Sequence, residues 1–226
     1  MKQQQQQMYL VGGIALIAVV VFAIAVVIGN QGGVTSRSGL DYGEIPSTQL
    51  EDGTYVLGNP DAPITIVEFA DFNCPHCQDY KSTIDQVLEE LVEPGLAKFE
   101  FRVYPILGAD SVYYAQLLEC AADQLGAEGF WRAHEELFYH ASRGVSGNDA
   151  GRRIADELGL NYTELLECTR SADQYNANLA LGREVAVQGT PAVRLRYADG
   201  ELQIGASERA GIPFDELEQL VQLANQ

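Results

Sequence analysis

The chain has 226 residues, of which 46% are hydrophobic, and it carries 14 lysine and arginine residues against 32 aspartate and glutamate residues. This length allows one sizeable domain with an insertion and does not favour a second full domain. The net charge of −18 at pH 7 offers no basic surface, so a nucleic-acid partner is not expected.

The first pattern along the chain is an apolar run at residues 9–28, YLVGGIALIAVVVFAIAVVI, which contains no charged residue. At a helical rise of about 1.5 Å per residue, this run matches a hydrocarbon core of about 30 Å. It therefore predicts a transmembrane helix behind a short cytoplasmic head at residues 1–8. A cleavable signal peptide is the alternative, but its apolar region usually spans about 7–15 residues before an A-x-A-like site, which is missing after Ile28.

Residues 29–53 are rich in Gly, Ser and Thr and show little apolar periodicity, so they are predicted to be a linker. The folded domain is then expected to cover residues 54–226. Because Lys2 is the only charged side chain before the apolar run, the amino terminus is expected in the cytoplasm. These features predict a single-pass protein of the cell membrane with an extracytoplasmic domain.

The domain begins with a predicted strand–helix–strand unit. Residues 63–72 form a nearly continuous apolar and β-branched run, which is typical of a buried parallel strand. Residues 75–92 have helical spacing of apolar side chains. Residues 98–106 alternate apolar with polar side chains and predict a half-buried strand.

A helical block is expected at residues 108–187, approximately, because apolar residues there keep helical spacing in five pieces, 110–125, 127–141, 148–158, 162–169 and 172–187. The period then changes to that of a β-hairpin turning at Asp199-Gly200, and an amphipathic helix closes the chain. The predicted order is β-α-β, an all-helical insertion, and β-β-α. This is an α/β fold.

Two of the four cysteines, Cys74 and Cys77, lie in the stretch EFADFNCPHCQDY, and several kinds of site use such a pair. A zinc ribbon would need a second Cys-x-x-Cys, which Cys120 and Cys168 do not form. Covalent haem would need a histidine where the chain has Gln78.

Histidine-based metal sites are not expected either. The stretch HEELF at residues 134–138 lacks the second histidine of a zinc-protease helix. His134 and His140 do not share a helical face, so ordinary surface or packing roles are expected for both. We therefore predict neither a metal nor a cofactor.

A redox role fits the local geometry. If the helix begins after Cys74, then Cys74 is its N-cap, Pro75 occupies the first helical position, His76 the second and Cys77 the third. The free backbone N–H groups and the helix dipole should then stabilise a Cys74 thiolate, with His76 adding positive charge. A stabilised thiolate favours the reduced pair, so the Cys74–Cys77 disulfide should readily oxidise other thiols. Cys77 would be the resolving thiol.

The stretches VEFADFNCPHC and GTPAV, followed by a hairpin and a final helix, resemble the DsbA-like thiol:disulfide oxidoreductases. The resemblance covers residues 54–225 and implies a thioredoxin-like fold with an all-helical insertion. The stretch GFWRAHEELF is similar to one in the membrane-anchored, BdbD-like branch of this family.

The resemblance implies roles for particular residues. Pro191 matches the family's cis-proline, which packs against the disulfide and leaves the Thr190 backbone free to pair with a bound peptide; an ordinary trans proline is the alternative. Glu68 matches a buried acid that relays a proton to the second cysteine, although a carboxylate at a strand end could also reach water.

Cys120 and Cys168 are expected to form a structural disulfide within the insertion, since the resemblance and an oxidising compartment both favour pairing. The alternative is two free buried cysteines.

The implied function is enzymatic: a membrane-tethered oxidoreductase that introduces disulfides into exported proteins through Cys74 and Cys77. Its expected partners are reduced or unfolded exported proteins and a membrane quinone-linked reoxidase of the DsbB or VKOR type. Thr190 stands where DsbA itself has Val, and isomerase-type and reductase-type relatives carry Thr there. A reductase or isomerase therefore remains an alternative, as does a tethered chaperone with a structural disulfide.

Overall fold

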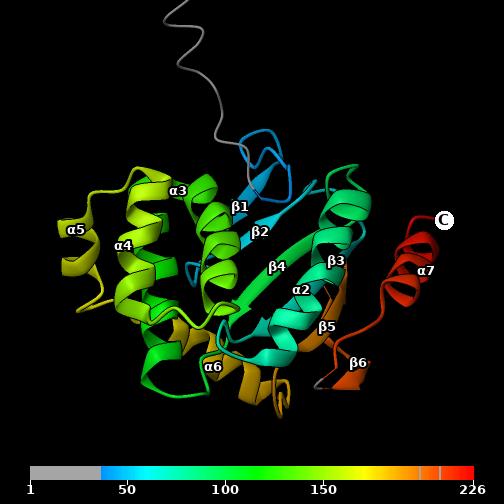
Figure 1. The fold of residues 1–226 in the computed structure, drawn as a ribbon. Helices are drawn as coiled ribbons and strands as arrows, with labels where there is room; N and C mark the ends of the chain where they lie inside the picture. Colours follow the sequence, from blue (N-terminus) through cyan, green and yellow to red (C-terminus); the bar gives the residue numbers. More distant parts are fainter. Residues whose placement is uncertain (1–36, 199, 209) are drawn as a thin grey trace, which may run out of the picture. The chain divides into compact units, whose positions relative to one another are not determined.

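The computed structural model describes residues 37–198, 200–208 and 210–226. The predicted head, the predicted membrane helix at 9–28 and the first part of the predicted linker lie outside these residues. Within the described ranges, no helix is long and apolar enough to cross a membrane. Figure 1 shows the domain of residues 37–226 as a mixed sheet with helices packed on both faces.

The elements follow the predicted β-α-β, helical block, β-β-α order, with two short strands added at the start. The strands are β1 Ser47–Gln49, β2 Tyr55–Leu57, β3 Ile64–Ala70, β4 Lys98–Val103, β5 Ala192–Tyr197 and β6 Gln203–Glu208. The helices are α2 Pro75–Val87, its π-helical continuation η1 Leu88–Val92, α3 Ala109–Ala141, α4 Gly147–Leu158, α5 Tyr162–Cys168, α6 Tyr175–Glu184 and α7 Phe214–Ala224.

The sheet has the strand order β1-β2-β4-β3-β5-β6, which places β3 near its centre. β3 and β4 are parallel, as expected for strands joined by helix α2, whereas β5 pairs with β3 in the antiparallel direction. All seven residues of β3 are buried, as its continuous apolar run predicts. Both faces of β3 therefore pack in the protein interior.

The two faces of β3 pack against different helices because successive side chains point in opposite directions. Ile64, Ile66 and Ala70 belong to the main core, which also contains the buried residues of α2, α3 and α7. Val67 and Phe69 belong to a smaller cluster that includes Leu179 and Leu181 of α6. Glu68 lies two residues after Ile66 and two before Ala70, so its side chain is on their face of β3, toward α2.

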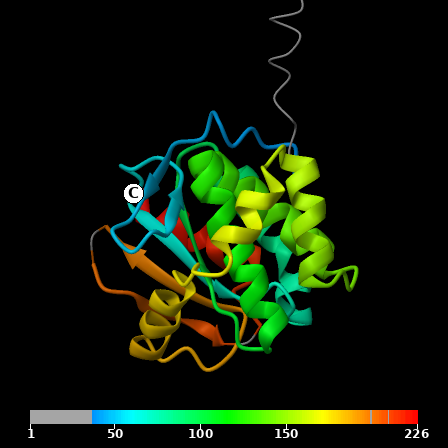
Figure 2. The same ribbon diagram turned by 90° about the vertical axis from the view of Figure 1, so that its left-hand side faces the viewer.

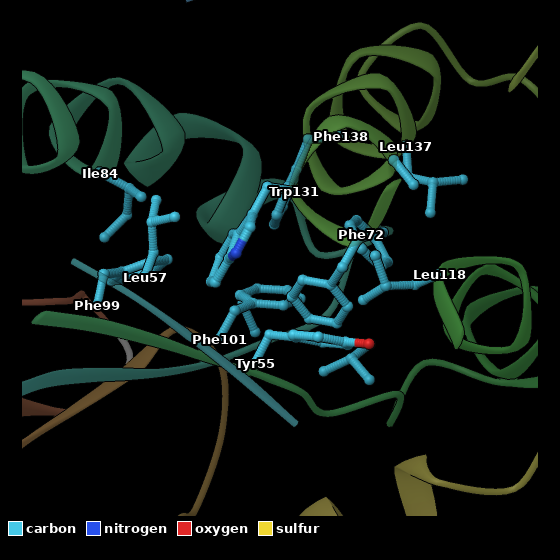
Figure 3. Packing of buried hydrophobic residues seen from close by; sticks show 14 of the residues in the cluster. Tyr55, Leu57, Phe72, Ile84, Phe99, Phe101, Leu118, Trp131, Leu137 and Phe138 are labelled. Carbon is cyan, nitrogen blue, oxygen red and sulfur yellow. The ribbon is translucent and has the colours of Figure 1, made fainter. Parts of the chain in front are cut away.

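The main core contains an aromatic cluster around Phe72, which follows β3 directly. The Phe72 ring centroid lies 4.7 Å from that of Phe138 in α3 and 5.6 Å from that of Phe101 in β4. Figure 3 shows these rings with Trp131 between the sheet and the helices. The cluster joins the chain segment before the cysteine pair to the helical insertion.

The insertion consists of α3 to α6, and in Figure 2 α3 and α4 lie side by side at the front of the view. Gly126, with φ of 67°, breaks α3 into two helices, where the sequence predicts a boundary between 125 and 127. A disulfide links Cys120 of α3 to Cys168 of α5 across a sequence separation of 48. In the chain-entropy description, closing such a loop stabilises the fold by roughly 4 kcal/mol.

The predicted linker at 29–53 is wrong from residue 37 onward, because that part of the chain belongs to the folded domain. Leu40, Tyr42 and Ile45 are buried in the main core. The buried carboxylate of Glu135 in α3 holds this segment by accepting the backbone N–H of Arg37 at 2.9 Å and the Tyr42 hydroxyl at 2.9 Å. These long-range contacts leave no periodic pattern in the sequence.

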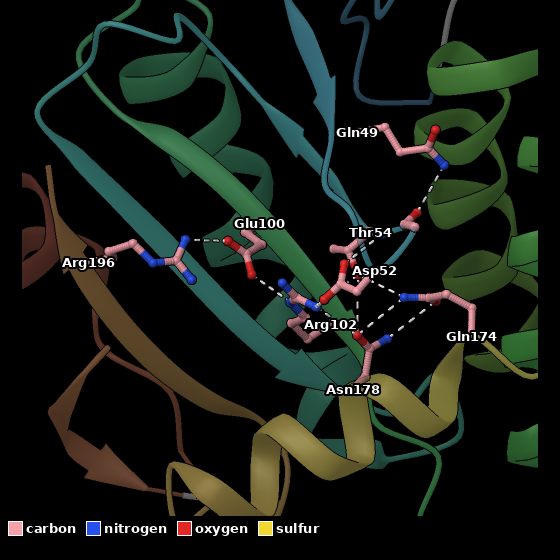
Figure 4. Close-up of polar contacts among 9 residues, drawn as sticks. Gln49, Asp52, Thr54, Glu100, Arg102, Gln174, Asn178 and Arg196 are labelled. Atoms are coloured by element: carbon pink, nitrogen blue, oxygen red, sulfur yellow. Dashed lines mark hydrogen bonds and ion pairs between the residues drawn. The ribbon is translucent and has the colours of Figure 1, made fainter. Parts of the chain in front are cut away.

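Strand β4 also differs from its prediction as half-buried, because Glu100 and Arg102 are both buried. Glu100 accepts hydrogen bonds from Arg102 Nε at 2.5 Å and from Arg196 Nη1 of β5 at 2.6 Å. Arg102 also contacts three side chains from other segments, Asp52, Thr54 and Asn178 (Figure 4). Mutual pairing makes burial of these charges tolerable and ties α6 to the sheet.

His134 is a fully buried residue of α3 without a hydrogen-bond partner on either ring nitrogen. It packs against aromatic rings, with the Phe101 centroid 4.3 Å away and that of Phe138 5.1 Å away. Burial, assisted by the positive charge of Lys81, lowers the pKa of His134 well below 6.5. The imidazole is therefore neutral in the folded state, in a packing role.

This environment predicts an acid-sensitive contribution to stability. As the pH falls below about 6.5, the unfolded chain takes up a proton at His134 that the folded state excludes, so the free energy of unfolding decreases. His134→Leu removes this decrease, and its stability relative to the wild type should rise as the pH falls from 7 to 5. Urea unfolding at several pH values measures the difference. Phe138→Leu, a neighbouring core change without a titrating group, should shift stability by a pH-independent amount; the same behaviour for His134→Leu would contradict the assignment.

Candidate redox site

The cysteine pair lies where β3 ends and α2 begins. Cys74 is the N-cap residue of α2 with an extended backbone, φ −77° and ψ 118°, and Pro75 is the first helical residue. The Cys74 N–H donates to the Asp71 carbonyl at 3.0 Å, and the Cys74 carbonyl accepts the Gln78 N–H at 3.0 Å. Proline is well suited to this position because the N–H that it lacks would have no helical partner.

The two cysteines differ in accessibility. Cys74 is 6% exposed and Cys77 is 0% exposed, and both are free thiols. Cys77 is three residues further along, inside the first turn of α2, and faces the core. An incoming thiol can therefore reach the sulfur of Cys74 more easily than that of Cys77.

Thr190 and Pro191 lie beside Cys74 in the fold, although they come much later in the chain. β5 pairs with β3 so that Ala192 faces Phe69, which brings the preceding loop beside the start of α2. The Thr190–Pro191 peptide is cis. The Cys74 thiol donates to the Thr190 carbonyl at 3.4 Å, joining residues that are 116 positions apart.

Glu68 is a buried acid on the α2 face of β3. Burial raises its pKa to about 8, which the negative charge of Asp85 reinforces and the positive charge of Lys81 opposes. Burial and the charge of Glu68 both raise the pKa of the Cys77 thiol far above its ordinary value. At neutral pH, the interior therefore holds protons on both Glu68 and Cys77.

Of the remaining predicted residues, two lie between the cysteines and two lie in the helical insertion. Pro75 and His76 are exposed in the first turn of α2. Cys120 and Cys168 lie in the helical insertion and make their own disulfide.

The sequence interpretation missed Asp71, whose fully buried carboxylate accepts backbone N–H groups beside the cysteine turn. Its position directly after a buried strand was the available signal.

One group of potential metal ligands occurs among the described residues, formed by Glu136, His140 and Glu157 with ligand atoms within 4.8 Å of one another. Arg37 pairs with Glu136 at 2.7 Å, and His140 pairs with Glu157 at 2.9 Å. Because positively charged and donor groups already occupy these carboxylates, we assign no metal to them.

The raised pKa of Glu68 predicts a stability change at alkaline pH. The contribution of a protonated Glu68 is complete below about pH 4.5 and is lost as the pH rises through about 8. Glu68→Gln stays neutral, so its free energy of unfolding should exceed that of the wild type by roughly 3–5 kcal/mol at pH 9 and by little at pH 5. Denaturant unfolding of the reduced protein measures this difference. The exposed variant Glu93→Gln is the control, and equal differences at both pH values would show that Glu68 is charged throughout.

Comparison with known proteins places this site in a family. The family model described as Thioredoxin matches residues 50–207. Disulfide bond formation protein D of Bacillus subtilis is 28% identical over 153 residues, which cover 62% of this chain and 67% of the relative.

Solved structures agree with this assignment. A thioredoxin-like oxidoreductase from Silicibacter pomeroyi DSS-3 is 27% identical with a TM-score of 0.59, covering 78% of this chain and 94% of that one. The fold also matches that of oxidised BdbD from Bacillus subtilis, with a TM-score of 0.59 at 23% identity, covering 80% of this chain and 97% of that one. The chain therefore belongs to the thioredoxin family and, within it, to the DsbA-like thiol-disulfide oxidoreductases.

Proposed function

We propose that this oxidoreductase works as a membrane-tethered oxidase that introduces disulfide bonds into exported proteins through Cys74 and Cys77. The observation that carries the proposal is the asymmetry of the pair at the start of α2. Cys74 is the accessible N-cap residue, whereas Cys77 is buried against the core. The Cys74 sulfur can therefore react with a substrate, while the Cys77 sulfur remains to resolve the mixed disulfide.

The exchange transfers two electrons from substrate to enzyme. A substrate thiolate attacks the Cys74 sulfur of the Cys74–Cys77 disulfide, forming a mixed disulfide and releasing Cys77 as the leaving thiolate. A second substrate thiolate then attacks the substrate sulfur of the mixed disulfide and releases Cys74. The substrate leaves with a new disulfide, and the enzyme is left as the reduced dithiol.

Glu68 is proposed to supply the proton that Cys77 takes as it leaves. A thiol with a raised pKa is a poor leaving group as the thiolate, so proton transfer to its sulfur assists the step. Glu68 lies on the face of β3 beneath α2, and its pKa of about 8 leaves it protonated at neutral pH.

Thr190 is proposed to hold the substrate chain. It ends the loop beside Cys74 and precedes Pro191, at a point where an extended peptide could pair with its backbone. This arrangement would present a substrate cysteine to Cys74.

The proposed direction of electron flow is argued from two residues, His76 and Thr190. His76 is exposed in the first turn of α2, where a positive charge favours a thiolate at the N-cap and so favours the reduced pair. Thr190 offers only a neutral dipole near the sulfurs, so we expect net oxidation. A reductase or isomerase of the same fold, and a tethered chaperone, are the alternatives.

Location and reoxidation complete the proposal. The apolar run at 9–28 would anchor the chain, with its amino terminus in the cytoplasm and its domain outside. A quinone-linked membrane protein of the DsbB or VKOR type would then accept the two electrons.

Trapping of mixed disulfides tests the assigned roles. Cys77→Ala should accumulate covalent complexes with an unfolded protein that carries a disulfide bond, because Cys74 opens that bond and no Cys77 thiol remains to resolve the mixed disulfide. Cys74→Ala should accumulate none, since Cys77 is buried. Non-reducing gels and peptide mapping measure both. The reverse pattern would exchange the roles of the two cysteines.

The reduction potential tests the direction. Equilibration of the wild type with glutathione should give a potential well above about −270 mV, the value for thioredoxin. His76→Pro should lower it, and Thr190→Val should change it by less. A wild-type value near that of thioredoxin would replace the oxidase with a reductase.

A further inference from the structure

Asp71 is a buried carboxylate that the exchange steps do not use. It follows β3 directly, and its side chain is fully buried. Its Oδ1 accepts the Asn73 N–H at 2.9 Å, and its Oδ2 accepts the N–H groups of Ile106 at 2.8 Å and Leu107 at 3.1 Å. Three charge-assisted hydrogen bonds thus hold the carboxylate in place.

These bonds join the two chain segments that leave the carboxyl-terminal ends of β3 and β4. One segment is the turn that leads into Cys74, whose N–H also donates to the Asp71 carbonyl at 3.0 Å. The other is the segment between β4 and α3, which is also held by the Tyr104 N–H donating to the Ala70 carbonyl at 2.7 Å. Asp71 therefore fixes the position of the second segment relative to Cys74.

The second segment carries an exposed apolar pair, Ile106 and Leu107, which are 45% and 54% exposed. Large apolar side chains that are exposed, and that are held by the same residue as the turn before Cys74, suit a substrate that shows its own apolar side chains, as an unfolded polypeptide does. A small thiol such as glutathione has no comparable apolar surface to contact them.

We propose that Asp71 is a positioning residue that holds the apolar pair beside Cys74, where the pair contacts the apolar side chains of unfolded polypeptide substrates. This inference rests on the proposed function and names the part of the site that favours polypeptides over small thiols. The carboxylate is suited to the task because both of its oxygens accept hydrogen bonds. An asparagine presents one oxygen and one NH₂ group, so it can hold only one of the two segments.

The test compares a polypeptide substrate with glutathione. In Asp71→Asn the two segments are no longer joined, so the apolar pair occupies its position beside Cys74 for a smaller fraction of the time. The KM for a reduced, unfolded protein should rise about tenfold with little change in kcat. The rate of exchange with glutathione should be unchanged, because glutathione has no comparable apolar surface for the pair to contact.

Three further variants separate positioning from a general structural role. Ile106→Ser/Leu107→Ser changes only exposed side chains and should raise the KM by a similar factor. Adding Asp71→Asn to it should raise the KM no further, because both changes remove the same contact. Glu135→Gln is the matched control: its buried carboxylate likewise accepts two backbone N–H groups, from Arg37 and Ser38, and its KM should match the wild type.

An unchanged KM in Asp71→Asn, multiplicative effects in the combined variant, or an equal loss of glutathione exchange would overturn the inference. If Asp71→Asn does not fold, the apolar-pair variant decides alone, and an unchanged KM there overturns it. A wild type that exchanges no thiols with either substrate would instead refute the proposed function.

Discussion

The antiparallel pairing of β5 with β3 is the contact on which the redox site depends. It brings the Thr190 carbonyl to the Cys74 thiol, although the two residues are 116 positions apart. The pairing holds because β3 is buried on both faces, between α2 on one side and α6 on the other. A one-residue slip would reverse the faces of β3 and move Glu68 away from α2. The packing of β3 therefore fixes which residues of β3 and β5 lie at the redox site.

Burial also controls the charge of the site. Glu68 and Cys77 share the interior, and each has a raised pKa because an isolated charge there is poorly solvated. The negative charge of Glu68 further opposes a Cys77 thiolate, so two adjacent charges are strongly disfavoured. Protonation of Glu68 relieves this repulsion when Cys77 ionises. This coupling offers a physical reason for placing an acid beneath a redox helix despite its cost to stability at alkaline pH.

The sequence predicts the elements whose signal is local. The apolar run of β3, the helical spacing after Pro75 and the break at Gly126 agree with the structure. Strands β1 and β2 were missed because each has three residues and depends on its neighbours in the sheet. The buried ion pair of Glu100 and Arg102 was also hidden, since alternation alone assigns charged residues to solvent. In the site, the Cys-Pro sequence predicts the N-cap position of Cys74. The hydrogen-bond donors to Asp71 could not be predicted, because two of them come from a distant part of the chain.

Asp71 illustrates why such a residue escapes sequence analysis. Its carboxylate lies where β3, the cysteine turn and the entrance to the helical insertion meet, and its hydrogen-bond donors come from segments 2 to 36 positions away. Burying a carboxylate is costly, yet an apolar residue there would leave three backbone N–H groups without acceptors. The negative charge thus satisfies donors that the irregular chain exposes at the strand ends. Because α3 begins shortly after Leu107, the same hydrogen bonds also fix where the insertion leaves the sheet.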